Sequence, residues 1–229
     1  MQKASGREPV KRPKPPAAPK LPRTTPEREL EPLEDGERFA QALLRGGKWA
    51  HLKVRSLTFD ACRVHQLDLS GAELPRWTAV DCEFQACNLA NLEGEDSSLL
   101  RVTLNQCKCS GARIHQATWR DVDLVDCKGD YASFQGLKAR QVRLRGCDLR
   151  QVEFYECQFD SVIFHECDLS QASFSNCRFE LSEFKGCDLT GLRGLANLRG
   201  ARMNAADLMT IAIPLARELG IGLISETDP

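Results

Sequence analysis

The chain has 229 residues with 31 Lys plus Arg against 32 Asp plus Glu, and 42% of its residues are hydrophobic while only 7% are aromatic. This composition is typical of one globular domain with a short additional segment. No stretch approaches the about 20 consecutive apolar residues of a membrane-spanning helix, and residues 1–25 lack the apolar core of a signal peptide. The sequence therefore predicts a cytoplasmic protein.

The cysteine content is high, with 11 residues. In a short secreted chain such a number indicates a disulfide framework, but here it is odd, the chain is long and no export signal is recognisable. We therefore expect free, buried thiols.

The N-terminal segment differs in composition from the rest of the chain. Residues 1–25 carry seven Lys and Arg against Glu8 alone, which gives a net charge of +6, together with six prolines. Such a segment favours extended conformations and has little apolar surface to bury. We expect residues 1–31 to form a disordered basic tail whose removal leaves the thermal midpoint unchanged. A weak nucleic-acid contact and a merely solubilising role are its two interpretations.

Residues 32–51 are predicted to form an N-terminal capping helix and a lead-in to the next segment. Four apolar residues share one helical face and two glycines follow them, namely Phe39, Ala40, Leu43, Leu44, Gly46 and Gly47. Glycine after the last apolar residue is a common helix end.

Residues 52–208 repeat with a period of five. Steps of five from Phe59 to Leu189 give 27 positions, 25 of them apolar, and a second series from Leu57 to Cys187 has the same score. A helix would repeat about every 3.6 residues, so this pattern is not helical. If each pentapeptide forms a short extended side followed by a turn, four pentapeptides make one square coil with both series inside.

A second period, four pentapeptides long, supports the square coil. It consists of six cysteines in one inward row, Cys87, Cys107, Cys127, Cys147, Cys167 and Cys187. Sulfurs in a row do not converge on one point as tetrahedral zinc requires, so we predict no metal and no cofactor. We expect the weakest packing at residues 92–98, where Gly94 and Ser97 replace two apolar side chains.

The units Cys147-Asp148-Leu149, Cys167-Asp168-Leu169 and Cys187-Asp188-Leu189 resemble the repeat of the pentapeptide-repeat family. The resemblance covers residues 52 to about 210. It implies an all-β solenoid, a right-handed quadrilateral β-helix, here of about eight coils. Some family members bind DNA gyrase as acidic mimics of DNA, which makes a type II topoisomerase the alternative partner. A DNA mimic needs sustained negative charge, whereas residues 101–150 carry 10 basic and 5 acidic residues.

Residues 209–229 are predicted to form a C-terminal helix. Ile211, Leu215 and Leu219 recur every four positions, and further apolar residues follow at Ile221, Leu223 and Ile224. Pro214 is expected in the first turn of the regular part. The excess of apolar residues suggests a homodimer contact through Ile211, Leu215 and Leu219, and a helix folded back on its own coil is the alternative.

The outward residues decide the predicted function. Neither a histidine pair, a phosphate loop nor a metal-binding motif is present, so we predict no enzymatic activity. Two charged sets form the candidate interaction surface: Arg140, Arg143, Arg145, Arg150, His165 and Lys185, and opposed to them Asp148, Asp168 and Asp188. Turn support by the aspartates and a scattered, solvated arginine surface are the simpler interpretations. We predict a protein–protein interaction module whose partner the sequence does not identify.

Overall fold

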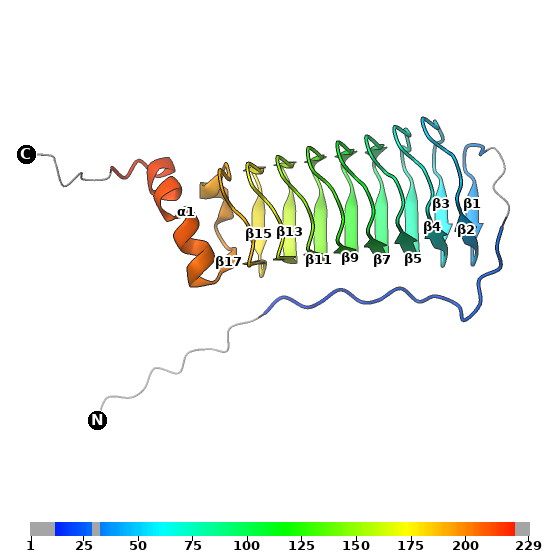
Figure 1. Cartoon of the computed structure of the whole chain (residues 1–229), viewed down its shortest axis with the longest axis horizontal. Helices are drawn as coiled ribbons and strands as arrows, with labels where there is room; N and C mark the ends of the chain where they lie inside the picture. Colours follow the sequence, from blue (N-terminus) through cyan, green and yellow to red (C-terminus); the bar gives the residue numbers. More distant parts are fainter. Residues whose placement is uncertain (1–11, 29–32, 223–229) are drawn as a thin grey trace, which may run out of the picture.

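The computed structural model describes residues 12–28 and 33–222. From β1 (Arg38–Ala40) onward the chain forms a parallel β-solenoid of about eight turns. Figure 1 shows the coils stacked in one row, with the helix α1 (Ala205–Glu218) over one end and residues 12–28 running along the rod. Successive coils pair at a spacing of four pentapeptides, as in Thr78↔Ser98 and Ser98↔Thr118. The predicted coil of four pentapeptides is therefore confirmed.

Two sheets and one row of isolated bridges form the four sides of the rod. The larger sheet contains β1, β2 (Leu43–Arg45), β3 (Thr58–Asp60), β4 (Arg63–His65), β5 (Thr78–Gln85), β7 (Ser98–Asn105), β9 (Thr118–Val125), β11 (Lys138–Arg145), β13 (Gln158–His165), β15 (Arg178–Glu180), β16 (Glu183–Lys185) and β17 (Arg202–Met203). The smaller sheet contains β6 (Glu93–Glu95), β8 (Arg113–His115), β10 (Ser133–Gln135), β12 (Glu153–Tyr155) and β14 (Ser173–Ser175). The remaining side is the bridge row that includes Asp148↔Asp168 and Asp168↔Asp188.

The coils bend at residues with positive φ, which recur every five positions. The longest strands each cover two sides and contain one such bend, for example Asp81 (φ 54°) in β5 and Asp121 (φ 55°) in β9. A single left-handed residue costs roughly 1–2 kcal/mol when it is not glycine. The hydrogen bonds to the coils on both sides hold the bend in place.

Stacked aromatic rings fill the C-terminal half of the core. The ring centroids of Phe154 and Phe174 lie 4.9 Å apart, and those of Phe164 and Phe184 lie 4.7 Å apart. These distances equal the roughly 4.8 Å spacing of neighbouring strands. Each ring therefore stacks on its equivalent one coil away.

The cysteine row lies inside the rod, as predicted. All six of its residues are buried and none forms a disulfide. The Sγ atom of Cys147 donates a hydrogen bond to the carbonyl of Leu124 at 3.7 Å. The neighbouring Cys127 thiol and burial raise the pKa of Cys147 above its ordinary value, so this thiol stays protonated.

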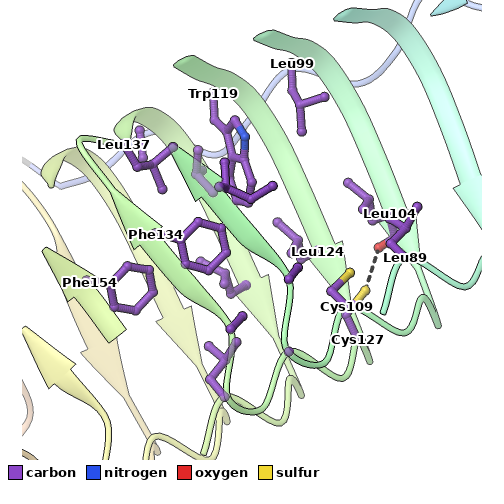
Figure 2. Close-up of a pocket in the computed structure, with 18 of the residues that line it drawn as sticks. Leu89, Leu99, Leu104, Cys109, Trp119, Leu124, Cys127, Phe134, Leu137 and Phe154 are labelled. Carbon is purple, nitrogen blue, oxygen red and sulfur yellow. Dashed lines mark hydrogen bonds between the residues drawn. The ribbon is translucent and has the colours of Figure 1, made fainter. Parts of the chain in front are cut away.

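The core contains a cavity of about 70 Å³. It lies where the inward row of Leu69, Leu89, Leu149, Leu169 and Leu189 is interrupted by two smaller residues, Cys109 and Gly129. Figure 2 shows Cys109, Trp119 and Phe134 around this space. Burial raises the pKa of the Cys109 thiol, in agreement with a site that is dry and apolar.

The expected weak point at Gly94 is packed differently from the prediction. A Cβ atom at Gly94 would lie 3.1 Å from Ile114 Cδ1 and 3.2 Å from Trp77 Nε1. Larger neighbours thus fill the volume that glycine leaves, which sequence periodicity alone does not show. The cavity borders this coil, since Trp77 and Ile114 also line it, and extends to Cys109 and Gly129.

The predicted N-terminal capping helix is wrong. Residues 38–45 form β1 and β2, and Phe39 and Leu44 pair in register with Phe59 and Val64. The solenoid therefore begins one coil before residue 52. Its open edge is covered by the N-terminal segment, because Leu43 exchanges backbone hydrogen bonds with the segment around Glu27.

The C-terminal end differs from the prediction in its details. The one-residue shift of register after Leu189 is confirmed, since Phe184 pairs with Met203 instead of with the residue four full pentapeptides later. Helix α1 begins at Ala205, earlier than expected, and Pro214 lies in its interior instead of its first turn. Leu223 and Ile224 lie outside the described residues. Within residues 12–28 and 33–222, no helix is long and apolar enough to cross a membrane.

Polar side chains attach α1 to the last coil. Asp207 accepts a hydrogen bond from the Gly186 amide at 2.8 Å, and Glu218 accepts bonds from the amides of Gly194 and Ala196. Ile211 is 3% exposed and packs in the core of the rod. The helix is therefore a cap, and Ile211 is not a free dimer contact.

We predict that Cys109→Leu stabilises the rod. The larger side chain restores one of the two missing leucines of the row and occupies part of the cavity, which should raise the free energy of unfolding by about 0.5–2 kcal/mol. Cys147→Leu is the matched control, because the same enlargement in a fully packed row should cost about 1–3 kcal/mol. Urea denaturation measures both, and equal effects of the two changes would contradict this account of the cavity.

Candidate interaction surface

The structure places six of the predicted surface residues along one corner of the rod. Arg145, His165 and Lys185 are in register on the outside of β11, β13 and β16. Asp148, Asp168 and Asp188 form the parallel row three residues further along each coil, on the next side. The two rows are therefore neighbours across a bend instead of opposed. We call these six residues the charged corner.

The aspartates of the charged corner support turns. Asp168 accepts a hydrogen bond from the amide of Ser170, and Asp188 accepts one from the amide of Thr190, both at 2.9 Å. The hydrogen bonds from Thr190 hold the pKa of Asp188 below its ordinary value. These geometries are those of Asx turns, so a turn-supporting role is present in the structure.

The excess of positive charge predicted for residues 101–150 is neutralised by nearby carboxylates. Arg143 and Arg145 both pair with Asp123, at 2.6 and 3.2 Å. Arg140 pairs with Asp160 at 3.3 Å on the other side of the bend. Arg150 pairs with Asp148 at 2.7 Å and with Asp168 at 3.7 Å. The four arginines thus form no continuous band of unpaired positive charge.

The side formed by the smaller sheet carries a shallow groove of about 480 Å³. Its lining is mostly charged: Glu73, Pro75, Glu93, Gly94, Glu95, Arg113 and His115. Two of its carboxylates are held in ion pairs, Glu73 with Lys53 at 2.6 Å and Glu93 with Arg113 at 2.7 Å. Across the described ranges, no group of three His, Cys, Asp or Glu residues could hold a metal ion.

Where the structure describes it, the N-terminal segment lies against the rod, whereas the sequence predicted a disordered tail. Residues 12–28, which we call the strap, run in an extended conformation along the larger sheet (Figure 1). The Ala17 amide donates to Asp121 Oδ1 at 2.9 Å, and the Lys20 amide donates to Asp81 Oδ1 at 2.8 Å. Residues 1–11 and 29–31 of the predicted tail lie outside the described residues.

The strap lies on the row of bends in the larger sheet. This row, which we call the seam, contains Asp81, Arg101, Asp121, Gln141 and Ser161. Asp121 is only 8% exposed. Arg101 forms a two-pronged ion pair with Asp81, whose pKa is lowered by this pairing and by the hydrogen bond from the Lys20 amide. The seam therefore offers fixed carboxylates to the backbone of the strap.

Sequence reasoning missed the strap although a signal for it is present. Every third residue is half-buried while most of the others are exposed, namely Pro13, Pro16, Pro19, Pro22 and Thr25. A polyproline helix has three residues per turn, so one edge of the strap faces the rod. Prolines at strict three-residue spacing were the available indication. The basic side chains of the strap are exposed. The nucleic-acid contact stays a prediction.

The comparisons with known proteins agree with this architecture. A family profile described as a pentapeptide repeat region matches residues 77–154 and 138–210, which together exceed half of the chain. The chain belongs to the pentapeptide-repeat family. Members of this family are generally non-catalytic. The pentapeptide units also continue before the matched region, as the coil from Phe39 shows.

Two solved pentapeptide-repeat structures are similar in fold. Full-length QnrB1, a plasmid-mediated fluoroquinolone resistance protein, is 18% identical over 81% of this chain and 100% of that chain, with a TM-score of 0.33. HetL, involved in heterocyst differentiation regulation in the cyanobacterium Nostoc sp. strain PCC 7120, is 21% identical over 75% of this chain and 86% of that chain, also with a TM-score of 0.33. These likenesses concern the fold alone. No curated protein matches the sequence.

We predict that the double change Asp81→Ala and Asp121→Ala releases the strap from the pentapeptide-repeat rod. The amides of Ala17 and Lys20 lose their acceptors, so their hydrogen exchange should approach that of a free peptide. The matched control, Asp148→Ala with Asp168→Ala, removes two carboxylates elsewhere and should leave this exchange unchanged. Protection that persists without Asp81 and Asp121 would contradict the role of the seam.

The same contact should depend on pH. The pKa of Asp81 is lowered in the folded protein, so its contribution is present above the ordinary value of 3.8 and is lost as the pH falls through the lower, folded value. The amide resonances of Lys20 should therefore stay constant from neutral pH to about pH 5 and shift only under strongly acidic conditions.

Proposed function

We propose that this pentapeptide-repeat protein is a non-catalytic scaffold that binds a protein partner at the charged corner. The observation that supports the proposal is the register of two rows of side chains on rigid coils, one with Arg145, His165 and Lys185 and the other with three aspartates. Their spacing along the rod is fixed at about 4.8 Å by the sheet hydrogen bonds. A partner with complementary charges at such steps meets side chains whose positions are already set, which reduces the entropic cost of binding.

The charged corner is most accessible at the C-terminal end of the rod. The side chains of Arg145 and His165 are 41% and 32% exposed, and Lys185 and Asp188 are exposed. Among the described residues Lys185 has no ion-pair partner, whereas Arg145 shares Asp123. We therefore place the strongest contact to an acidic segment of the partner at Lys185.

The distribution of reactive groups supports a role without catalysis. Ten of the 11 thiols are buried in the core, and the other one, Cys109, lines the internal cavity. The aspartates of the charged corner and of the seam are held by backbone amides or by arginines. Catalysis needs polar groups that converge on a substrate, and such a set is not found among the described residues.

A type II topoisomerase remains the alternative partner, on grounds of family membership. The charge pattern of this chain favours a topoisomerase less than it favours another protein partner. Acidic residues of the rod are paired across coils, as in Asp81 with Arg101 and Asp123 with Arg143. A mimic of DNA would instead present unpaired negative charge at short intervals along its axis. Supercoiling by gyrase with and without a quinolone, in the presence of this protein, distinguishes the two partners.

We predict that reversing the basic row of the charged corner abolishes partner binding. The test variant carries Arg145→Glu, His165→Glu and Lys185→Glu, and the control carries Lys138→Glu, Arg178→Glu and Arg193→Glu, all exposed elsewhere. Quantitative capture from the native cell should recover a saturable partner with the parent and the control, and at least about 10-fold less with the test variant. Equal recovery by all three proteins would overturn the assignment of the charged corner.

The homodimer expected from the sequence stays a prediction, with a different contact face. Ile211 is buried in the core and Leu215 packs against it, while Leu219 is 59% exposed. The outer face of α1 also exposes Met209 (74%) and Ile213 (51%). A second copy that covers this face would place the two rods end to end.

Replacing Ile213 with Glu tests that face. An exposed residue tolerates the charge in the monomer, but the same charge in a covered contact is costly. The expected result is a shift from dimer to monomer in sedimentation velocity with an unchanged thermal midpoint of the monomer. A parent protein that sediments as a monomer at micromolar concentration would exclude the dimer.

A further inference from the structure

We propose that the seam is a binding groove for extended basic peptides with proline at every third residue. In this view the strap is the built-in occupant of the groove, and a partner's peptide of the same kind displaces it. The seam and the charged corner are different surfaces, so this inference does not depend on the partner proposed above. Three observations support it: the matching periods of strap and rod, the nature of the hydrogen bonds, and the charges.

The period of the strap matches the period of the rod. A polyproline helix rises about 3.1 Å per residue, so three residues advance about 9.3 Å. Two coils of the solenoid advance about 9.6 Å. Accordingly Ala17 and Lys20, three residues apart, bind Asp121 and Asp81, which are two coils apart. A peptide in this conformation therefore meets equivalent positions of the seam at each of its turns.

The hydrogen bonds of the seam involve the backbone of the strap. The donors are the amides of Ala17 and Lys20, and the carbonyl of Pro22 accepts a hydrogen bond from Arg63 at 3.2 Å. Side-chain contacts are added near the end of the strap, where the hydroxyl of Thr25 accepts a hydrogen bond from Arg63 and Arg28 pairs with Glu37. Backbone contacts select a conformation and a spacing more than a particular sequence. Any peptide with prolines facing the rod and free amides between them meets the same requirement.

Charge and shape favour the same class of peptide. The strap carries Arg12, Lys14, Lys20 and Arg23, all exposed. The seam presents the carboxylates of Asp81 and Asp121, and Asp121 is nearly inaccessible beneath the strap. Beside the seam, the outward positions of β5 and β7 hold Val80 and Leu100, both half-buried. Two carboxylates that accept hydrogen bonds from backbone amides, next to apolar side chains, suit a peptide with prolyl rings facing the rod and free amides between them.

The covalent connection of the strap controls access to the groove. A tethered ligand acts at an effective concentration that reaches the millimolar range for short links. A free peptide with equal contacts therefore binds the intact protein poorly. It gains access when the strap is weakened, or when it makes additional contacts of its own. The strap thus acts as a competitive inhibitor within the same chain.

A direct test uses the full chain with a weakened strap. In this variant Pro13, Pro16, Pro19 and Pro22 are replaced by Gly, which removes the preference for the polyproline conformation while the rest of the protein is kept. The probe is a fluorescently labelled synthetic peptide of residues 12–28, measured by fluorescence anisotropy. We expect saturable binding to the variant that is at least about 10-fold tighter than binding to the parent.

Two controls separate a groove from non-specific attraction. A peptide of the same composition in which no two prolines are three residues apart should bind at least about 10-fold more weakly, although its charge is unchanged. Adding Asp81→Ala and Asp121→Ala to the weakened-strap variant should abolish binding of the original peptide. Amide exchange of the strap in the weakened variant verifies its release.

The anisotropy measurements have outcomes that support the peptide groove and outcomes that exclude it. Binding that depends on proline spacing and on the two seam carboxylates supports a peptide groove. Absence of binding to a variant whose strap is verifiably released would overturn it and leave the strap as a brace of its own rod. Equal binding of both peptides would also overturn it, since charge alone would then be the cause. Neither result affects the capture experiment on the charged corner.

Discussion

The structure depends on the hydrogen bonds between successive coils, which require every coil to contain the same number of residues. Each coil pairs with the next at a spacing of four pentapeptides, from Thr58↔Thr78 to His165↔Lys185. A side chain therefore has an equivalent directly above and below it, about 4.8 Å away. Ring stacking, the thiol row and the ion pairs between coils are consequences of this one constraint. Where the spacing becomes one residue shorter, at Met203, the solenoid ends.

This constraint also explains which parts of the fold the sequence predicts. A five-residue period sustained over many coils admits one interpretation, so the solenoid and its buried cysteines were predictable. The first coil was missed, because Phe39, Ala40, Leu43 and Leu44 satisfy a helical period, whereas Phe39 and Leu44 alone satisfy the five-residue period. The unbroken series of apolar residues at steps of five back from Phe59 to Phe39, and the pairing with Phe59 and Val64, distinguish the two. Residues 38–45 alone are too short to show this series, which becomes visible only when they are aligned with the coils that follow.

The site was harder to predict because surface contacts depend on positions that lie far apart in the sequence. Counting charges by segment indicates an excess of positive charge in residues 101–150. In the structure, however, Arg143 and Arg145 share Asp123 from the preceding coil. Composition likewise indicates a tail with nothing to bury, yet its amides reach carboxylates 61 and 104 residues away. In both cases the partner is fixed by the coil geometry. The three-residue spacing of the prolines was visible, but its match to two coils needs the spacing of the strands.

The seam and the charged corner lie on adjacent bends and share one side of the rod. Arg143 stands on that side next to the seam, Arg145 stands next to the charged corner, and Asp123 pairs with both. A partner that draws Arg145 away from Asp123 leaves Arg143 with the whole carboxylate and alters the potential beside the strap. Such an effect needs no movement of the backbone, which is held by hydrogen bonds on both sides. Coupling between the two surfaces would therefore be electrostatic and should weaken as salt shortens the screening length.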